Sequence, residues 1–291
     1  MKPAPFGVAR AQSLDEVFDL LDQYGTEARL LAGGQSLLAS LNMRLLAPQM
    51  LIDINHVGGL DGIDHVAAPN GIEPARGRLR IGALVRHCGL ERSPEVAARV
   101  PLIAAAVPHV AHLAIRNRGT VGGSIAFADP AAELPACAVA LDAEIEVAGR
   151  GGTRRVAAAD FFKGLYDTDL RPGEMVTALH VPAAAPSQRF GFAEIARRHG
   201  DYALIGLAAM AAVEDGALAE PRLVFFSAGP TPVRARGAER ALAAGALDDA
   251  VAALAGDLDP PGDLEVDAAT RRYLAGVLLR RVAGQLQGAR P

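Results

Sequence analysis

The sequence has little cysteine, and this scarcity excludes several kinds of site. Its two cysteines, Cys88 and Cys137, lie far apart and outside any Cys-x-x-Cys pair. Two thiols cannot supply the four ligands of a zinc ion or an iron–sulfur cluster, and they do not make a disulfide framework. We therefore expect reduced thiols and a cytoplasmic protein.

The sequence also lacks an excess of positive charge and any long apolar run. It has 29 Lys and Arg against 33 Asp and Glu, which gives a net charge of −4. Sequence-independent binding to nucleic acid needs a basic surface, so we expect no nucleic-acid partner. No uncharged apolar run reaches the roughly 18 residues of a membrane span. Residues 1–13 have no apolar core, so we do not expect a secretion signal there.

The 291 residues are enough for two domains of roughly 100–200 residues each. Hydrophobic residues make up 51% of the chain and charged residues 21%, which is the balance of a globular protein. Strands and helices are mixed along the chain, no internal repeat is present, and residues 182–186 have the composition of a linker. We therefore expect an α+β protein with a boundary near residue 182.

The N-terminal part predicts a small unit of strands and helices. Ser13 and Glu16 form a capping box that begins a helix, and the helix closes at Tyr24-Gly25. A strand over 28–31 leads into a second helix over 37–46, which Pro48 stops. A strand over 51–54 completes the unit, and a glycine pair stands at its strand-to-helix turn.

Further elements follow from the same patterns. Asp129-Pro130 predicts the start of a helix that runs to about Asp142. Residues 116–124 carry too many glycines and polar groups for a regular element. The remaining expected elements are a strand over 79–84, helices on both sides of Pro101, strands over 143–148 and 176–181 with a turn at 149–152, a hairpin of 203–213 and 222–228 around 214–216, and a helix over 268–286.

Two glycine pairs carry the strongest chemical signal. Gly33-Gly34 and Gly122-Gly123 are each followed closely by a hydroxyl residue. Glycine lets backbone N–H groups approach a ligand, and a helix that starts just afterwards favours a phosphate. Neither loop has the Gly-x-Gly-x-x-Gly pattern, and the chain has no P-loop, so a Rossmann domain and a P-loop ATPase are disfavoured. Taken alone, each pair is also compatible with an ordinary tight turn.

Two long motifs give the chain a family resemblance. AGGQSLLASLNMRLLAPQMLIDI and, further along the chain, IRNRGTVGGSIAFADPAAELPA resemble the FAD-binding medium subunits of the molybdenum hydroxylases, as does RRHGDYA in the last third. That family includes carbon monoxide dehydrogenase and xanthine dehydrogenase. The resemblance covers essentially the whole chain. It implies a two-part FAD-binding domain of the vanillyl-alcohol-oxidase (PCMH) type over 1–182, with subdomains of about 1–57 and 58–182, and a C-terminal α+β domain of hairpin strands and helices over 183–291.

The resemblance also implies cofactor-binding residues. The first glycine loop would hold the FAD pyrophosphate, the second the same phosphates and the ribityl region, and Glu133 the FAD hydroxyls. Leu170 would pack against the flavin ring, and Tyr202 would lie beside it. Gln35, Ser124 and Glu133 stand where relatives often have His, Asn and Asp. The residues implied are Ala32, Gly33, Gly34, Gln35, Ser36, Leu37, Thr120, Val121, Gly122, Gly123, Ser124, Glu133, Leu170 and Tyr202.

Other polar residues are weaker candidates. His109 and His112 could share a helix face, but they lack a metal-binding pattern, so we predict no metal site. We expect both cysteines to be small buried hydrophobes. The pairs Arg116/Arg118 and Arg154/Arg155 are expected in solvent, although the first pair lies beside the second glycine loop and could balance diphosphate charge or face a partner.

The leading hypothesis is an electron-transfer subunit of an oxidoreductase. The resemblance implies non-covalent FAD in this chain, and molybdopterin and 2Fe–2S clusters only in a large and a small partner subunit, as a dimer of heterotrimers. No residue of this chain is expected to act on the organic substrate. One alternative is a free-standing FAD-dependent oxidase or reductase, which needs a base or anion clamp that the sequence does not show. Another is a chain that has lost FAD, against which the two intact glycine pairs argue.

Overall fold

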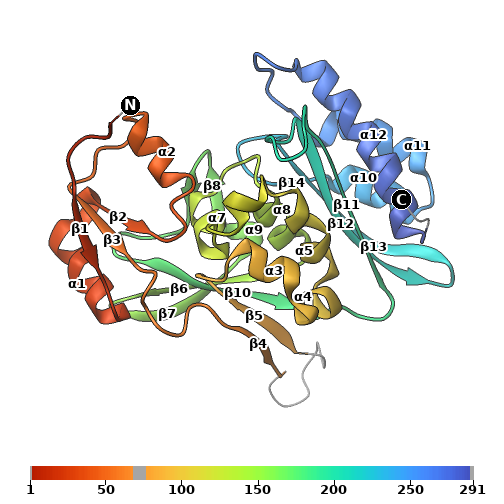
Figure 1. The fold of residues 1–291 in the computed structure, drawn as a ribbon. Helices are drawn as coiled ribbons and strands as arrows, with labels where there is room; N and C mark the ends of the chain where they lie inside the picture. Colours follow the sequence, from red (N-terminus) through yellow and green to blue (C-terminus); the bar gives the residue numbers. More distant parts are fainter. Residues whose placement is uncertain (1, 68–76, 289–291) are drawn as a thin grey trace.

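The computed structural model describes residues 2–67 and 77–288. It places the N-terminal strands and helices at one end of the molecule, a five-stranded sheet with its helices in the middle, and a second antiparallel sheet with the last three helices at the other end (Figure 1). Strands and helices are mixed throughout, in agreement with the α+β prediction.

The N-terminal unit is a three-stranded parallel sheet in the order β1-β3-β2. Helix α1 begins as predicted, since the Ser13 hydroxyl accepts a hydrogen bond from the N–H of Glu16. The strand over Gly7–Arg10 was not predicted. The bounds of the unit are β1 Gly7–Arg10, α1 Leu14–Tyr24, β2 Ala28–Leu31, α2 Leu37–Asn42 and β3 Met50–Asp53.

Helix α2 is shorter than the sequence predicted. It ends at Asn42 rather than near Leu46, because Arg44 takes a left-handed backbone conformation with φ of 59°. The N–H of Leu45 then donates to the carbonyl of Ser40, and the N–H of Arg44 to that of Leu41. This pairing is a Schellman motif, which closes the helix before the proline is reached.

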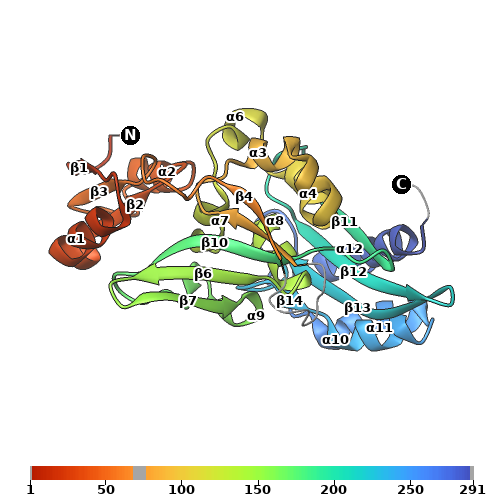
Figure 2. The ribbon, with the colours of Figure 1, turned by 90° about the horizontal axis from the view of Figure 1, so that it is seen from below.

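The central unit is an antiparallel sheet in the order β4-β5-β10-β6-β7, covered on one face by helices (Figure 2). The β6–β7 hairpin turns at Gly149 and Gly152, as predicted. The elements of the unit are β4 Ile63–Val66, β5 Arg78–Gly82, α3 His87–Arg92, α4 Pro94–Arg99, α5 Pro101–Ala106, η3 Val107–His109, α6 Leu113–Arg116, α7 Val121–Phe127, α8 Glu133–Ala140, β6 Glu144–Gly149, β7 Gly152–Ala157, α9 Ala158–Phe161, β8 Phe162–Gly164, β9 Asp167–Thr168 and β10 Met175–Pro182.

Two predictions for this unit were wrong. Residues 121–127 form helix α7 in spite of their glycines, because the Thr120 hydroxyl caps the first turn by accepting from the N–H of Gly123. Helix α8 begins at Glu133 and not at Asp129. The Asp129 carboxylate accepts from the N–H of Ala131 and so forms a turn before the helix instead of capping it.

The C-terminal sheet has the order β11-β12-β13-β14 and is buried on both faces. Alternate residues of β12 point to opposite faces, so Leu207 packs against the last helices while Ala208 packs against the central unit. This explains the unbroken apolar run in that strand. The elements are β11 Gln188–Ile195, which was not predicted, β12 Ile205–Glu214, β13 Ala217–Phe226, β14 Val233–Arg234, α10 Arg236–Ala243, α11 Leu247–Asp257 and α12 Ala268–Leu286.

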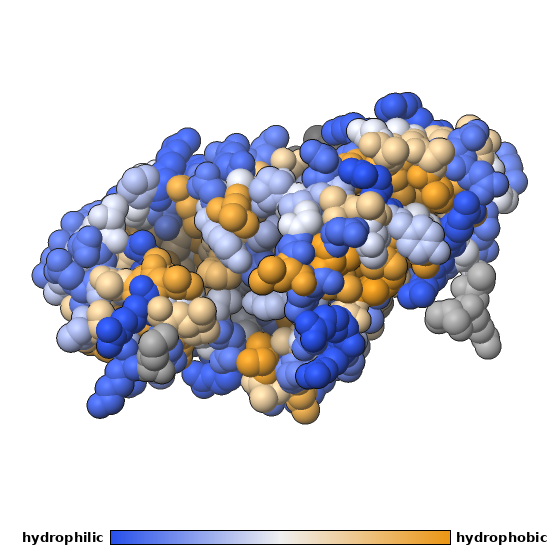
Figure 3. Space-filling view, turned by 90° about the horizontal axis from the view of Figure 1, so that it is seen from above, coloured by the Kyte–Doolittle hydropathy of each residue, from blue (hydrophilic) through white to orange (hydrophobic). Residues whose placement is uncertain are grey.

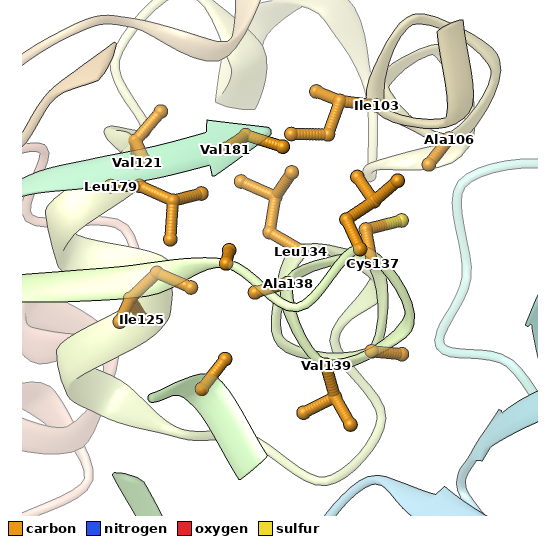
Figure 4. Close-up of a cluster of buried hydrophobic side chains, with 14 of the residues drawn as sticks. Ile103, Ala106, Val121, Ile125, Leu134, Cys137, Ala138, Val139, Leu179 and Val181 are labelled. Atoms are coloured by element: carbon orange, nitrogen blue, oxygen red, sulfur yellow. The ribbon is translucent and has the colours of Figure 1, made fainter. Parts of the chain in front are cut away.

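The largest hydrophobic core joins the helices of the central unit to both large sheets. Figure 4 shows Val121 and Ile125 of α7 beside Leu179 of β10, and Leu134 of α8 near Ile103 of α5. This core holds α7 and α8 in fixed positions. The second glycine pair, in the first turn of α7, and the 128–132 turn before α8 are therefore held as well.

Candidate functional site

The first glycine loop, residues 32–36, joins β2 to α2. Gly34 has a φ of 74°, which favours glycine there. In the described residues 2–67 and 77–288, the backbone N–H groups of residues 33–37 make no hydrogen bond, while the Gln35 side chain donates to the Gly33 carbonyl. Successive free N–H groups at the start of a helix form an anion-binding surface.

The second glycine loop, residues 120–124, is the cap and first turn of α7. Four of its five N–H groups are already used: Val121 donates to the carbonyl of Val85, Gly122 to that of Ala83, Gly123 to the Thr120 hydroxyl and Ser124 to the Thr120 carbonyl. A Cβ on Gly122 would lie 2.5 Å from the Cβ of Ala83, so glycine is needed here for close packing. This loop therefore offers mainly the Ser124 side chain and the partial positive charge of the helix start.

The structure brings the two loops into contact. A Cβ on Gly33 would meet the backbone of Arg118 and Gly119, just before the second loop. The Arg118 side chain is exposed, and neither it nor Arg86 makes a salt bridge within the described part of the chain. Burial and then the charge of Arg118 lower the pKa of Arg86, which still leaves it protonated. Five free amides and two guanidinium groups without a carboxylate partner thus suit a diphosphate.

Buried His87 supports the second loop, and the sequence reasoning did not single it out. Its backbone N–H donates to the carbonyl of Gly119, and its Nε2 lies 3.1 Å from the carbonyl oxygen of Thr120. Burial lowers the pKa of His87 to about 4, so the ring is neutral and its Nε2–H can donate to that carbonyl. The available signal was a pair of polar residues, Arg86 and His87, directly after a predicted apolar strand.

A second group of candidate residues gathers at the start of α8. Burial, followed by the charges of Glu194 and Asp129, raises the pKa of Glu133 to about 8. Partial desolvation, followed by the charges of Asp129, Tyr166 and Glu133, raises the pKa of Tyr202. The fold supports this grouping, because Tyr202 lines one cavity together with Pro130 and Ala131, which lie just before α8.

Tyr202 lies on the loop between β11 and β12, and its side chain is 69% exposed. Tyr166, at the turn of the β8–β9 hairpin, is also exposed and packs against Phe127 at the end of α7, with ring centroids 5.0 Å apart. A cavity of about 210 Å³ lies beside Tyr202, lined also by Pro130, Ser227 and Arg271. An exposed aromatic surface next to partly buried carboxyl groups can receive a flat, partly polar ring system.

Leu170 is the apolar residue that the family resemblance implied beside the flavin ring. It is partly buried and packs against the large central core, directly after the β8–β9 hairpin. The face seen in Figure 3 is hollowed between the N-terminal unit and the rest of the molecule, and apolar side chains gather around this hollow.

Two secondary predictions, on Arg116 and on the histidine pair, need correction. Arg116 is buried and not in solvent: it pairs with Glu91 at 3.0 Å and donates to the carbonyls of Val110 and Ala111. His109 and His112 do not share a helix, since one ends η3 and the other precedes α6. No group of three metal-ligating residues occurs in the described ranges 2–67 and 77–288.

The remaining charged and thiol candidates have ordinary surroundings. Arg154 pairs with Asp169 and Glu174, each at 2.7 Å, so it is held by carboxylates rather than free in solvent. Cys137 is buried, as expected, whereas Cys88 is only partly buried, and both are unpaired. Among the helices of the described residues, none is long and apolar enough to cross a membrane.

Comparison with protein-family models gives two matches that together cover almost the whole chain. Residues 4–184 match the model described as the FAD binding domain in molybdopterin dehydrogenase. Residues 190–286 match the CO dehydrogenase flavoprotein C-terminal domain.

Curated proteins of similar sequence are subunits of dehydrogenases. The chain is 35% identical to the 6-hydroxypseudooxynicotine dehydrogenase complex subunit alpha of Paenarthrobacter nicotinovorans, over 100% of this chain and 98% of that protein. It is 33% identical to the carbon monoxide dehydrogenase medium chain of Hydrogenophaga pseudoflava, over 97% of this chain and 96% of that one.

Solved structures agree with the sequence matches. A carbon monoxide dehydrogenase from Hydrogenophaga pseudoflava that lacks the Mo-pyranopterin moiety superposes with a TM-score of 0.93 at 34% identity, and all of both chains is covered. Quinoline 2-oxidoreductase from Pseudomonas putida 86 gives a TM-score of 0.91 at 36% identity and 99% coverage of both chains.

Proposed function

This chain belongs to the FAD-binding medium subunits of the molybdenum hydroxylases, and we propose that it binds FAD non-covalently and passes electrons from 2Fe–2S clusters of a partner subunit to an external acceptor. FAD, when bound, supplies the redox chemistry, because its ring can take up and release electrons singly or in pairs. The residues of this chain bind the cofactor, orient it and set its surroundings.

The observation that carries the proposal is the set of five free backbone N–H groups over residues 33–37, beside the guanidinium groups of Arg86 and Arg118, which have no carboxylate partner in the described part of the chain. Free donors and uncompensated positive charge fit the diphosphate of a dinucleotide. In this proposal the first loop, including Ser36 and Leu37, binds the diphosphate directly. The second loop adds the start of α7 and the Ser124 hydroxyl.

The flavin ring and its ribityl chain would lie toward the second group of residues, which includes Glu133 and Tyr202. Glu133 is held neutral at pH 7 by its raised pKa, so its carboxyl group can donate as well as accept a hydrogen bond to a cofactor hydroxyl. Exposed Tyr202 offers an aromatic face to the ring, and Leu170 an apolar contact.

We further propose that the complex contains a molybdopterin-binding large subunit and a small 2Fe–2S subunit, arranged as a dimer of heterotrimers in the cytoplasm. The two widely spaced cysteines cannot supply the four thiolates of an iron–sulfur cluster, so we place the 2Fe–2S clusters in another polypeptide. Relatives are themselves named as a subunit of a complex or a medium chain, which supports partners of this kind. A stable docked partner requires about 800 Å² of surface on each side.

The test is to purify the full chain alone and together with the products of the neighbouring open reading frames. The chain alone should show flavin absorbance at about 450 nm and should oxidise no organic substrate. Co-purification should give a larger species that contains molybdenum and iron. A flavin-free chain that binds no added FAD would overturn the cofactor assignment. A monomer that oxidises a defined substrate with FAD alone would support the free-standing oxidase instead.

A further inference from the structure

We infer that Arg86 is a positioning residue that fixes the two glycine loops at one separation, and that FAD affinity depends on this bridge. The inference rests on the proposed FAD site. Arg86 follows β5, and its guanidinium group reaches both loops: one terminal nitrogen donates to the carbonyl of Arg118, next to the second loop, and the other donates to the side-chain oxygen of Asn55 at 2.6 Å.

Asn55 completes the bridge on the other side. Its side-chain Nδ2 donates to the carbonyl of Ala32, the first residue of the first loop, at 2.9 Å. The same nitrogen donates to the Asp53 carboxylate at 2.6 Å, and the backbone N–H of Asn55 donates to that carboxylate at 3.0 Å. Asp53 ends β3, so the amide is held in one orientation by the N-terminal sheet.

The segment around Arg86 also supports the second loop through backbone contacts. Ala83 and Val85 accept backbone hydrogen bonds from Gly122 and Val121, and Arg86 pairs with Thr120 as an isolated antiparallel bridge. The guanidinium group of Arg86 therefore links the segment that supports the second loop to Asn55, which follows β3 and binds the first residue of the first loop. The planar fork of arginine can reach two acceptors at once, whereas the ammonium of lysine is a single point.

The position of the bridge matters because FAD would contact both loops together. The first loop supplies five free amides, so its distance from the start of α7 decides whether one diphosphate can use both. Breaking the bridge leaves each loop intact but lets the distance between the loops vary. FAD must then fix this distance when it binds, and the free-energy cost of doing so weakens its affinity.

The experiment measures the dissociation constant of FAD for the full apo chain with four variants, Arg86→Gln, Arg86→Lys, Asn55→Ala and the double variant Arg86→Gln/Asn55→Ala. We expect each single variant to weaken FAD binding by about tenfold or more, since each removes charge-assisted hydrogen bonds. The double variant should bind about as weakly as the weaker single variant, because both changes break one bridge.

The matched control is Arg150→Gln. Arg150 also links the N-terminal unit to the central unit, through ion pairs with Asp19 and Asp22, but it lies in the exposed β6–β7 turn away from the glycine loops. Its removal should change FAD affinity by less than about twofold, as expected for a screened surface pair. Thermal melts of the apo variants show whether each one is folded.

The outcomes are distinct. Full affinity in Arg86→Lys would mean that Arg86 acts through its charge alone, and additive losses in the double variant would mean that Arg86 and Asn55 act separately; either result overturns the inference. Unchanged affinity in Arg86→Gln does so as well. Should Arg86→Gln fail to fold, Asn55→Asp keeps the acceptor for Arg86 but loses the donor to Ala32, and unaltered FAD affinity there would also overturn it. A wild-type chain that binds no FAD contradicts the proposed function itself.

Discussion

Gly33 packs directly against Gly119, although 86 positions separate them in the sequence. A Cβ on Gly33 would lie 2.9 Å from the Cα of Gly119 and would also meet the carbonyl oxygen of Arg118. Real Cβ atoms do not approach backbone this closely, so any side chain at residue 33 would push the two glycine loops apart. The contact is thus a direct constraint on the shape of the proposed FAD site.

The first prediction follows from this contact. Gly33→Ala and Gly122→Ala should each lower FAD occupancy of the purified chain by about tenfold or more, because the added methyl group displaces loop backbone in both cases. Gly151→Ala is the control, since no atom lies within 4 Å of the position that its methyl group would take. Occupancy is measured from the ratio of flavin to protein absorbance. Full occupancy in both loop variants would show that the diphosphate does not lie between the loops.

The sequence predicted several local features of the fold and of the candidate site. Ser13 and Glu16 predicted the start of α1, and the glycine pairs predicted both loops, because capping and backbone freedom depend on residues a few positions apart. The family motifs extended this to the order of the domains. Local patterns of this kind predict that a loop exists, but they do not predict which distant residues the loop contacts.

What the sequence could not predict depends on distant contacts. The run containing Gly122 was expected to be irregular, yet the Thr120 cap and the close approach to Ala83 make it helical. Arg116 was expected in solvent, but Glu91 and a turn of backbone carbonyls enclose it. In each case tertiary packing decides the outcome over local preference.

Gly206 provides a second prediction, on stability. It lies opposite Phe226 in the β12–β13 ladder, and a Cβ at residue 206 would overlap the phenyl ring. Gly206→Ala should lower the free energy of unfolding by on the order of 1–3 kcal/mol. Adding Phe226→Leu should restore part of this loss, because it frees the same space. Denaturant unfolding of the apo chain measures both, and simple additivity of the two changes would contradict the explanation.

Tyr202 is the third prediction. Its exposed side chain contributes little to folding, so Tyr202→Ala should melt within about 1 °C of the wild type and retain most of its FAD. We expect a shifted flavin potential or a changed rate of reoxidation, because the ring controls access and polarity beside the cofactor. Spectroelectrochemistry and stopped-flow oxidation are the measurements, with Tyr273→Ala, another exposed tyrosine on α12, as the control. Identical potentials and rates would assign Tyr202 a purely structural position.

His87 leads to a prediction at acid pH. Because burial lowers its folded-state pKa to about 4 from an ordinary value of 6.5, the unfolded chain binds the extra proton between these values. Stability is complete above pH 6.5 and falls as the pH drops toward 4, by about 1.4 kcal/mol per unit at most. His87→Gln, which cannot be protonated, should remove this part of the slope. Unfolding curves of the apo chain between pH 4 and 7 check it, and an unchanged slope would contradict it.

Glu133 should produce the opposite slope at higher pH. Burial and the neighbouring charges of Glu194 and Asp129 raise its folded-state pKa from 4.5 to about 8, so the folded chain keeps a proton that the unfolded chain releases. The stability from this proton is complete below pH 4.5 and is lost as the pH rises through 8.

Glu133→Gln mimics the protonated acid, so the apo variant should unfold at higher denaturant concentration than the wild type at pH 8 and at nearly the same concentration at pH 4.5. Glu214→Gln, at the exposed end of β12, should show no such gain. A wild-type chain whose stability does not depend on Glu133 at pH 8 would mean that this carboxyl group is ionised in the folded protein, and the hydrogen bond that it is proposed to donate to a cofactor hydroxyl would then be impossible.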